Sequence, residues 1–412
     1  MYINFWYAAE RSEVITNEAP TKVRMLALDF VLFRDSAGEV HCLSDTCVHR
    51  GGSLGRGKIK GDCVQCPYHG WEFDGDGVCQ KVPSLGSAGK PPTRARTDRY
   101  PVEEKYGLVH VFLGDLPEKE RPPIMEIPEY GNEGWRSTVQ EYNWEIDVQR
   151  AVENALDPAH NEFVHPTHGF SGANADYRVA ELTADETDWG TGFLTEYDSP
   201  PLEDDKMREG AGRDTNARIT AGSWTHGPTC NVTRINPVPD KHIHQYSYKT
   251  PVDETHSRSF LINLRNFVIE PENDERMKTR NDVVAGQDGE ILEYMNPLIA
   301  PPSNTKELFV PADKLIARYR EILKGYEANG WKIDMDKLSL GRQRVAYAIP
   351  SPSRRESKGW VIDPVPIVEP SESGAVQAVA EWAGGSGSVY LYDTYIKCLY
   401  IGQYISMPNI LA

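Results

Sequence analysis

Two short motifs near the start of the chain each pair a cysteine with a histidine. The first is Cys47-x-His49 and the second is Cys66-x-x-His69. Thiolates and imidazoles can together hold a [2Fe–2S] cluster, with two cysteines on one iron and two histidines on the other. Replacing thiolates by neutral nitrogen ligands raises the reduction potential of the cluster. The spacing therefore predicts a one-electron transfer centre held by two loops.

Two other kinds of site use the same residue types. A structural zinc site normally pairs like ligands locally, as C-x2-4-C and H-x3-5-H, whereas each motif here mixes cysteine with histidine. Cys63-Val64-Gln65-Cys66 has the C-x-x-C spacing of a thioredoxin-type redox motif, but no strand–helix–strand pattern surrounds it. The iron–sulfur interpretation is favoured over both.

The two motifs resemble the N-terminal domain of the Rieske non-haem iron oxygenases. Respiratory-type Rieske proteins carry a further cysteine beside each pair, and a disulfide joins the two loops. This chain has Arg50-Gly51-Gly52 after the first pair and Tyr68 within the second, so it lacks that bridge. In this respect it resembles the oxygenase and ferredoxin branch, which implies a lower-potential cluster that accepts electrons from a reductase.

A second group of candidate ligands follows downstream. Asp157 and His160 are three residues apart, so they would share a face of the helix that we expect to start near Trp144. His165 precedes Pro166, where that helix is expected to end, which lets the second imidazole turn back beside the first. Two imidazoles and a distant carboxylate form the facial triad of mononuclear Fe(II) oxygenases, which leaves positions open for O2 and substrate. Taken alone, His-x4-His more often marks two surface histidines on one helix.

The same segment resembles the family motif Asn-x2-Asp-x2-His-x4-His, which is matched by Asn154, Asp157, His160 and His165. The resemblance implies that His160 and His165 bind iron and that Asp157 and Asn154 serve catalysis. It also implies that Asp157 bridges to a cluster histidine of the neighbouring subunit in a head-to-tail trimer. A carboxylate between two imidazoles suits that role because it can orient both rings. We interpret His168 as a non-ligand.

The third iron ligand is expected to be a carboxylate far along the chain. The family places it on a late helix, in a pattern resembling (Glu/Gln)-Asp-x-x-(Ile/Val)-(Leu/Val)-Glu, and Asp288 matches this pattern. Asp282, Glu290 and Glu293 are the alternatives, and any of them could be a solvated helix charge.

Short strands are expected to position the cluster loops. Every second residue from 26 to 32 is apolar and a turn sequence follows at residues 35–39, which predicts a strand, a turn and a second strand. Residues 74–77 indicate another hairpin. Residues 1–120 should therefore form an all-β Rieske domain, followed by a proline-rich linker over residues 121–135.

Residues 136–412 should form the catalytic domain. Residues 175–268 alternate as strands and predict an antiparallel sheet, and residues 311–329 predict an amphipathic helix. The expected class is α+β, in which the Rieske domain precedes an antiparallel sheet with helices (a helix-grip arrangement) that walls the substrate pocket. Candidate lining residues, each equally compatible with ordinary sheet packing, are Trp224, His226, Tyr246, Tyr248, Leu264 and Asn266.

The C-terminal extension is longer than compact members of the family need. From residue 350 it is rich in proline, glycine and serine, and residues 389–404 form an aromatic, strand-like run. Gly384-Gly385-Ser386-Gly387 is interpreted as a loop, because it lacks the spacing and context of a dinucleotide-binding motif. We expect the extension either to line the pocket entrance or to cover a subunit interface.

Composition limits the partners of this chain. Its net charge of −17 disfavours nucleic acid, whose phosphates would be repelled. The start of the sequence lacks the basic region and apolar core of a signal peptide, and no apolar run is long enough to span a membrane. The seven cysteines show no disulfide framework. We therefore expect a cytoplasmic protein.

The resemblance implies a terminal oxygenase that uses O2 to act on a small organic substrate. The chain shows no flavin or nucleotide motif, so a separate reductase, or a ferredoxin, should supply electrons from NAD(P)H. Electrons would pass from the cluster, through His49 or His69 and Asp157, to the mononuclear iron of the next subunit in a homotrimer. The chain looks most similar to the vanillate and dicamba demethylase branch, which favours hydroxylation or oxidative demethylation. The alternatives are ring cis-dihydroxylation and, in a different class, a non-enzymatic Rieske electron carrier, which would need only the first domain.

Overall fold

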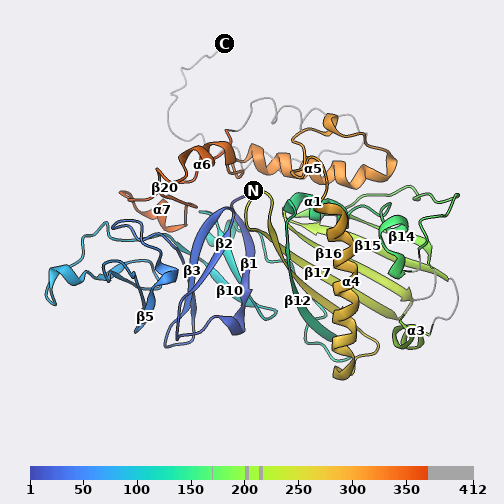
Figure 1. Cartoon of the computed structure of the whole chain (residues 1–412), viewed down its shortest axis with the longest axis horizontal. Coiled ribbons are helices and arrows are strands. Elements are labelled where there is room, and N and C mark those ends of the chain that lie inside the picture. The colour runs from blue at the N-terminus through green and yellow to red at the C-terminus, as the bar shows by residue number, and fades with distance from the viewer. Residues whose placement is uncertain (169, 200–203, 213–216, 370–412) are drawn as a thin grey trace, which may run out of the picture. The chain divides into compact units, whose positions relative to one another are not determined.

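Short antiparallel strands build the N-terminal part of the protein (Figure 1). The computed structural model describes residues 1–168, 170–199, 204–212 and 217–369. Within these residues the N-terminal strands form three sheets, with the orders β1-β11-β10, β2-β3-β4-β9 and β5-β6-β7-β8. The strands are β1 (Phe5–Arg11), β2 (Thr21–Met25), β3 (Leu28–Arg34), β4 (Val40–Ser44), β5 (Lys58–Lys60), β6 (Cys63–Gln65), β7 (Glu72–Phe73), β8 (Cys79–Lys81), β9 (Arg99–Tyr100), β10 (Val102–Lys105) and β11 (Leu108–Leu113).

The strand–turn–strand pattern predicted around residues 26–39 is confirmed. Strand β3 pairs with β2 on one side and with β4 on the other. The turn between β3 and β4 is closed by Asp35, whose Oδ1 accepts two backbone amides of that turn at 3.0 and 2.9 Å. The apolar side chains of these strands bury the cluster cysteines in one hydrophobic core, which includes Val31, Phe33, Leu43, Cys47, Leu54, Val64, Cys66 and Phe73.

A seven-stranded antiparallel sheet forms the centre of the part of the protein that follows the linker. Its strand order is β12-β18-β17-β16-β15-β14-β13. Every neighbouring pair is antiparallel, as the alternating pattern predicts. The strands are β12 (Arg136–Trp144), β13 (Asp185–Thr187), β14 (Gly190–Ser199), β15 (Ala217–His226), β16 (Cys230–Val238), β17 (Lys241–Pro251) and β18 (Ser257–Arg265).

The long helix α4 lies across this sheet in Figure 1. Gln140 of β12 holds it there, because its amide donates to Lys278 O at 2.9 Å and accepts from Asn281 Nδ2 at 2.9 Å. The predicted helix over residues 311–329 is present as α5. The α-helices are α1 (Val148–Ala155), α2 (Asn161–Val164), α3 (Asp205–Ala211), α4 (Asp274–Leu292), α5 (Lys314–Ala328), α6 (Met335–Gly341) and α7 (Ser353–Glu356).

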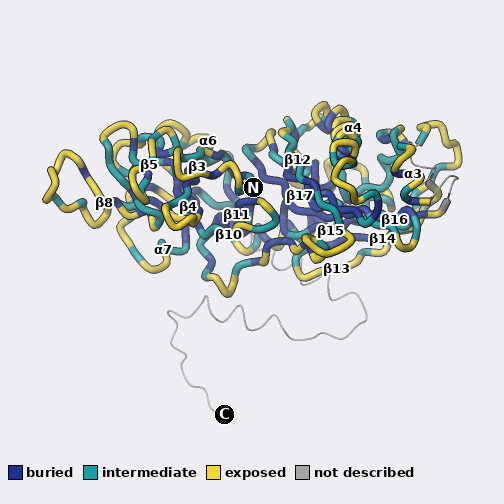
Figure 2. The backbone as a smooth tube through the Cα atoms, turned by 90° about the horizontal axis from the view of Figure 1, so that it is seen from below, coloured by how far each residue is buried: buried dark blue, intermediate teal, exposed yellow. Residues whose placement is uncertain are grey.

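Both faces of the large sheet are covered, and Figure 2 shows its central strands as largely buried. On one face, apolar side chains of β16, β17 and β18 pack against Ile124, Met125 and Ile127 of the predicted linker. On the other face, helix α4 and the sheet enclose a cavity. One face of the sheet therefore packs against the linker, and the other face lines a cavity.

The described end of the chain returns to the N-terminal strands. The amide of Ile3 donates to Trp331 O at 2.8 Å, and the amide of Ile333 donates to Met1 O at 2.9 Å. Further along, Arg354 pairs with the fully buried carboxylate of Asp98 at 2.7 Å. A short parallel pair, β19 (Tyr347–Ala348) with β20 (Asp363–Pro364), precedes the last described residues. The strand-like run and the glycine-rich loop expected beyond residue 369 lie outside the described residues.

Turns of 3-10 helix connect these elements. They are η1 (Ser12–Val14), η2 (Leu54–Arg56), η3 (Pro83–Leu85), η4 (Glu118–Glu120), η5 (Pro166–His168), η6 (Pro271–Asn273), η7 (Asn304–Lys306) and η8 (Pro311–Asp313). Among the described residues, no helix combines the length and apolar character needed to cross a membrane.

Candidate active site and metal centres

The two predicted cluster loops repeat one backbone pattern. The amide of Gly51 donates to Cys47 O at 2.9 Å in the first loop, and the amide of Gly70 donates to Cys66 O at 3.0 Å in the second. Each cysteine amide in turn donates, at 2.8 Å, to a carbonyl five residues further along. Gly51 and Gly70 have φ values of 71° and 72°, a left-handed conformation that glycine adopts without strain. Two equivalent turns therefore present one cysteine and one histidine each.

The four predicted cluster ligands come together at these turns. The thiols of Cys47 and Cys66 lie against each other, 1% and 2% exposed, while the rings of His49 and His69 are exposed with centroids 4.4 Å apart. Burial raises the pKa of Cys47 to about 12, so a thiolate here needs a cation beside it. A Cβ at Gly52 would lie 2.8 Å from Cys66 Sγ, so only glycine leaves room. Two buried thiols next to two exposed imidazoles fit a [2Fe–2S] cluster.

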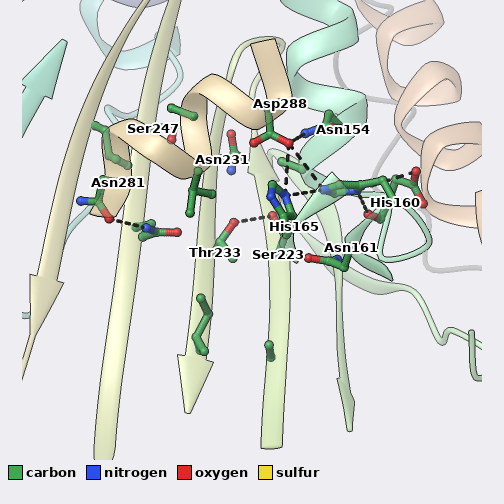
Figure 3. A pocket seen from close by; sticks show the side chains of 18 of the residues that line it. Asn154, His160, Asn161, His165, Ser223, Asn231, Thr233, Ser247, Asn281 and Asp288 are labelled. Atoms are coloured by element: carbon green, nitrogen blue, oxygen red, sulfur yellow. Dashed lines mark hydrogen bonds and ion pairs between the residues drawn. The ribbon is translucent and has the colours of Figure 1, made fainter. Parts of the chain in front are cut away.

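The three residues predicted to bind iron converge between α2 and α4 (Figure 3). His160 immediately precedes α2, His165 immediately follows it, and Asp288 lies on α4. The two Nε2 atoms are 3.2 Å apart, and Asp288 Oδ1 lies 3.3 Å from His165 Nε2 and 3.7 Å from His160 Nε2. Facial ligands at ~2.1 Å from one metal ion lie about 3 Å from each other, so these donors fit a mononuclear iron.

Hydrogen bonds orient both imidazoles with Nε2 towards this point. His160 Nδ1 lies 2.5 Å from Asp157 O, and His165 Nδ1 lies 3.0 Å from Gln287 Oε1. An acceptor beside Nδ1 holds the ring proton there and leaves Nε2 free to bind a metal. Gln287 Oε1 also accepts from the Thr167 hydroxyl at 3.0 Å. Sequence reasoning gave Gln287 no role, although it fills the first position of the family pattern that indicated the neighbouring aspartate.

Helix α1 orients the carboxylate. Asn154 Nδ2 donates to Asp288 Oδ1 at 3.0 Å, so the predicted catalytic residue Asn154 is a positioning residue. The helix begins at Val148, where the Asp147 side chain accepts the Gln149 amide at 3.1 Å. The residues near Trp144, expected to start the helix, instead end strand β12.

Asp157 lies between α1 and α2, not on a helix face with His160. Pro158 explains this, because a proline disfavours helical backbone at the residue before it and cannot continue a helix. The prediction of a shared helical face is therefore wrong. Asp157 contacts His160 through its backbone carbonyl, while its carboxylate accepts the Ala159 amide at 2.7 Å and stays 3.8 Å from His160 Nδ1.

The alternative carboxylates point elsewhere. Asp282 accepts from Gln140 Nε2 and from the Tyr142 hydroxyl, on β12. Glu293 accepts the backbone amide of Glu145 at 3.4 Å, and Glu290 is exposed. The ring of His168 lies 4.8 Å from that of His165, measured between centroids, but His168 is not part of the convergent group of three.

A cavity of about 230 Å³ extends from His160, His165 and Asp288 between α4 and the sheet. Its lining is mixed, because apolar side chains stand beside seven polar side chains of the sheet. A cavity in which polar groups accompany an apolar surface suits a small molecule. The sheet residues that line it are Phe193, Ile219, Ala221, Gly222, Ser223, Asn231, Thr233, Ile235, Pro237, Ile243, Gln245, Ser247, Lys249, Ser259 and Leu261.

The lining residues that the sequence suggested lie on the other face of the sheet. Tyr246 donates to Glu129 Oε2 at 2.8 Å, and Tyr248 donates to Met125 O at 2.6 Å, so both point towards the linker. Their strand neighbours, Ser247 and Lys249 among them, face the cavity instead, because successive side chains on a strand point to opposite faces. Of the six suggested residues, Trp224, His226, Tyr246, Tyr248, Leu264 and Asn266, none lines this cavity.

Lys249 is a cavity residue that no motif indicated. Its side chain is 5% exposed, and its ammonium group donates to Asn231 Oδ1 on the neighbouring strand. Burial lowers the pKa of Lys249 to about 8. A lysine inside a strand that is otherwise buried was the signal available in the sequence.

Comparison with known proteins identifies the family. Residues 5–101 match the Rieske [2Fe-2S] domain, and residues 144–329 match the Vanillate O-demethylase oxygenase C-terminal domain. The chain belongs to the Rieske oxygenases. This membership confirms the predicted family, the α+β fold class and the assignment as an oxidoreductase enzyme.

Two relatives show how far the similarity extends. Methylxanthine N1-demethylase NdmA of Pseudomonas putida is 29% identical over 311 residues, which are 74% of this chain and 82% of that protein. The 4beta-methylsterol monooxygenase of Methylococcus capsulatus is 30% identical over 263 residues, 63% of this chain and 68% of its own length. Rieske oxygenases that resemble this chain thus include demethylases and monooxygenases.

Solved structures share the fold. Pseudomonas putida NdmA with caffeine superposes with a TM-score of 0.67 at 24% identity, covering 79% of this chain and 91% of that one. Dicamba monooxygenase bound to 3,6 dichlorosalicylic acid gives a TM-score of 0.66 at 23% identity, covering 79% and 98%. The two-part architecture of this Rieske oxygenase is therefore shared along most of the chain.

Proposed function

We propose that this Rieske oxygenase is a terminal component that hydroxylates or oxidatively demethylates a small organic molecule. The observation that carries the proposal is the convergence of His160, His165 and Asp288 in the wall of one cavity. Demethylation is favoured because the catalytic part matches the vanillate demethylase domain and because the relatives include NdmA. Ring dihydroxylation is the second candidate, since phenoxybenzoate dioxygenase subunit alpha is also similar, at 36% identity over 180 residues.

The proposed ligands form two separate metal centres. Cys47, His49, Cys66 and His69 would hold the [2Fe–2S] cluster, and His160, His165 and Asp288 would hold the mononuclear iron. Bound iron would supply O2 activation at its open positions, and the cluster would supply electrons singly. The acceptors beside each Nδ1 would keep both imidazole protons there, and the substrate would bind in the cavity between α4 and the sheet.

We further propose that a separate reductase delivers electrons from NAD(P)H and that the chain forms a head-to-tail homotrimer in the cytoplasm. The exposed rings of His49 and His69 support this arrangement, because an exposed pair can meet another protein surface. Asp157 would bridge to a cluster histidine of the neighbouring subunit. Its carboxylate suits that role, since its Oδ1 accepts the Ala159 amide and an ionised carboxylate has further lone pairs to accept from an imidazole.

The test is O2 uptake with a surrogate reductase and a panel of methoxy- and methyl-substituted substrates. His160→Ala should abolish substrate-dependent O2 uptake and product formation while leaving the EPR signal of the reduced cluster unchanged. His256→Ala is the matched control, because that histidine is 49% exposed, pairs with Asp253 and does not line the cavity, so it should retain uptake. Loss of the cluster signal in His160→Ala, or full activity in that variant, would show that the two sites are assigned wrongly.

A further inference from the structure

Two positively charged side chains line the active-site cavity without a carboxylate partner. One is Lys249 on β17, and the other is Arg280 on α4. Among the described residues, no carboxylate lies within ion-pair distance of either group, whereas most other arginines here have such a partner. Lys249 has only the neutral amide oxygen of Asn231. The absence of a partner is notable in a chain whose net charge is −17.

The acids that line the cavity do not neutralise these cations. They are Asp157 and Asp288, and both have another role in the site. Asp288 faces the two imidazoles and Asn154, and Asp157 accepts the amide of Ala159. A metal ion held by Asp288 would add further positive charge. Lys249 and Arg280 therefore add positive charge to the cavity wall that no ion pair balances among the described residues.

Burial makes this arrangement costly unless a ligand completes it. Arg280 is half-buried, and desolvation lowers the pKa of its guanidinium against the opposing effect of the Asp204 charge. A guanidinium stays protonated in proteins, and a charge withdrawn from water without a partner destabilises the protein. An anion that enters the cavity would recover part of that cost. The guanidinium geometry matches a carboxylate, which can accept two parallel hydrogen bonds.

We propose that the substrate is a small organic anion, an apolar body with a carboxylate that pairs with Arg280. This inference rests on the proposed function and adds to it the chemical class of the substrate. The volume of about 230 Å³ limits the body to a small molecule, since it lies below the ~300 Å³ of typical ligand pockets. Apolar residues such as Phe193, Ile243 and Leu261 would contact that body, and Lys249 strengthens the positive potential.

The experiment measures binding, not turnover. Iron-loaded full-length protein without reductase is titrated calorimetrically with methoxy-substituted benzene, pyridine and naphthalene carboxylates, each matched with its carboxamide. We expect at least one carboxylate to bind more tightly than its amide. Arg280→Gln should remove that preference, with a loss of about 30-fold or more in affinity for the carboxylate. Arg280→Lys should bind the carboxylate more tightly than Arg280→Gln and less tightly than the natural protein. Lysine keeps the positive charge but lacks the planar guanidinium that donates two parallel hydrogen bonds.

Arg276→Gln is the matched control. Arg276 lies one turn earlier on the same helix, pairs with Asp204 outside the cavity and is 47% exposed, so its loss should leave the carboxylate preference unchanged. Iron content and the visible spectrum of the cluster show whether each variant is intact. If no carboxylate in the panel binds more tightly than its amide, or if Arg280→Gln keeps the preference, the proposal is overturned. Tight, Arg280-dependent binding without O2 uptake would instead count against the proposed function alone.

Discussion

At the scale of single residues, the site depends on groups that hold the ligands and not only on the ligands. Gln287 accepts hydrogen bonds from His165 and Thr167, and Asn154 donates to the carboxylate of Asp288. These contacts decide which nitrogen of each imidazole carries the proton and which way the carboxylate faces. Such neighbours commonly change metal affinity as strongly as moderate changes in the ligands themselves.

Gln287→Leu tests this at one position. The leucine cannot accept from His165 Nδ1, so the imidazole loses its fixed tautomer and orientation. We expect iron affinity to fall by about 10- to 100-fold, measured by titrating metal-depleted protein with Co(II) and following the visible bands. Gln287→Glu keeps an acceptor and should bind metal at least as well as the natural protein. Equal affinity in the leucine variant would mean that Gln287 only fills space.

At the scale of elements, a buried ion-pair network joins helix α1, which carries Asn154, to α5. Arg320 of α5 pairs with Glu153 of α1 at 2.7 Å and with Glu307 at 2.7 Å, and Arg150 of α1 reaches Glu307 at 2.6 Å. Three of these four side chains are close to 5% exposed and the fourth, Glu307, is 24% exposed. Glu153 precedes Asn154, so the network also sets the position of the residue that orients Asp288.

Arg320→Met should destabilise the fold strongly. It leaves Glu153 as a buried carboxylate whose remaining partners are Arg150, at 3.8 Å, and the neutral amide of Gln149, at 2.8 Å. Breaking a buried pair in this way costs about 3–5 kcal/mol, which urea denaturation followed by circular dichroism can measure. Arg318→Met on the same helix removes exposed ion pairs to Glu186 and Glu321 and should cost below ~1 kcal/mol. Similar costs for the two variants would mean that the network contributes little.

The elements also show what a sequence can predict and what it cannot. The cluster loops were predictable because the residues of each pair, such as Cys47 and His49, are close in sequence. A single turn of the backbone then brings both side chains to the same place. Pro158 indicates the helix break at Asp157, and this effect overrides the three-residue spacing that favours a shared helical face. The cavity-facing side of β17 was not predictable, because both faces of the sheet are covered. Aromatic residues such as Tyr246 and Tyr248 looked like pocket residues, and they are packing residues.

At the scale of the whole molecule, the proposed oxygenase needs two centres to exchange electrons. His49 and His69 are exposed on the cluster loops, and Asp157 lies beside His160 at the proposed iron site. In a head-to-tail trimer, the carboxylate of one subunit would meet the cluster of the next. Electron transfer and assembly are then linked, because the contact exists only between subunits.

Asp157→Asn tests that link. The amide keeps the size of the side chain but removes the charge that would hold two imidazoles, so both metals should remain bound. We expect the oxidation of the reduced cluster, on mixing with O2 and substrate, to slow by about 10- to 100-fold, measured by stopped-flow absorbance. Asp176→Asn, at an exposed position, should leave the rate unchanged. Unchanged kinetics in Asp157→Asn, or a monomer in analytical ultracentrifugation of the natural protein, would remove the bridging role.

The two-sided sheet has a consequence for how such an enzyme can diversify. On β17, Gln245, Ser247 and Lys249 face the cavity, while Tyr246 and Tyr248 face the linker. Changes at the first set can alter which molecules are accepted without disturbing the packing made by the second. Insertion of one residue into the strand would exchange the two sets and damage both tasks at once. Selectivity in this lineage should therefore drift by substitution at alternate positions, with strand length held constant.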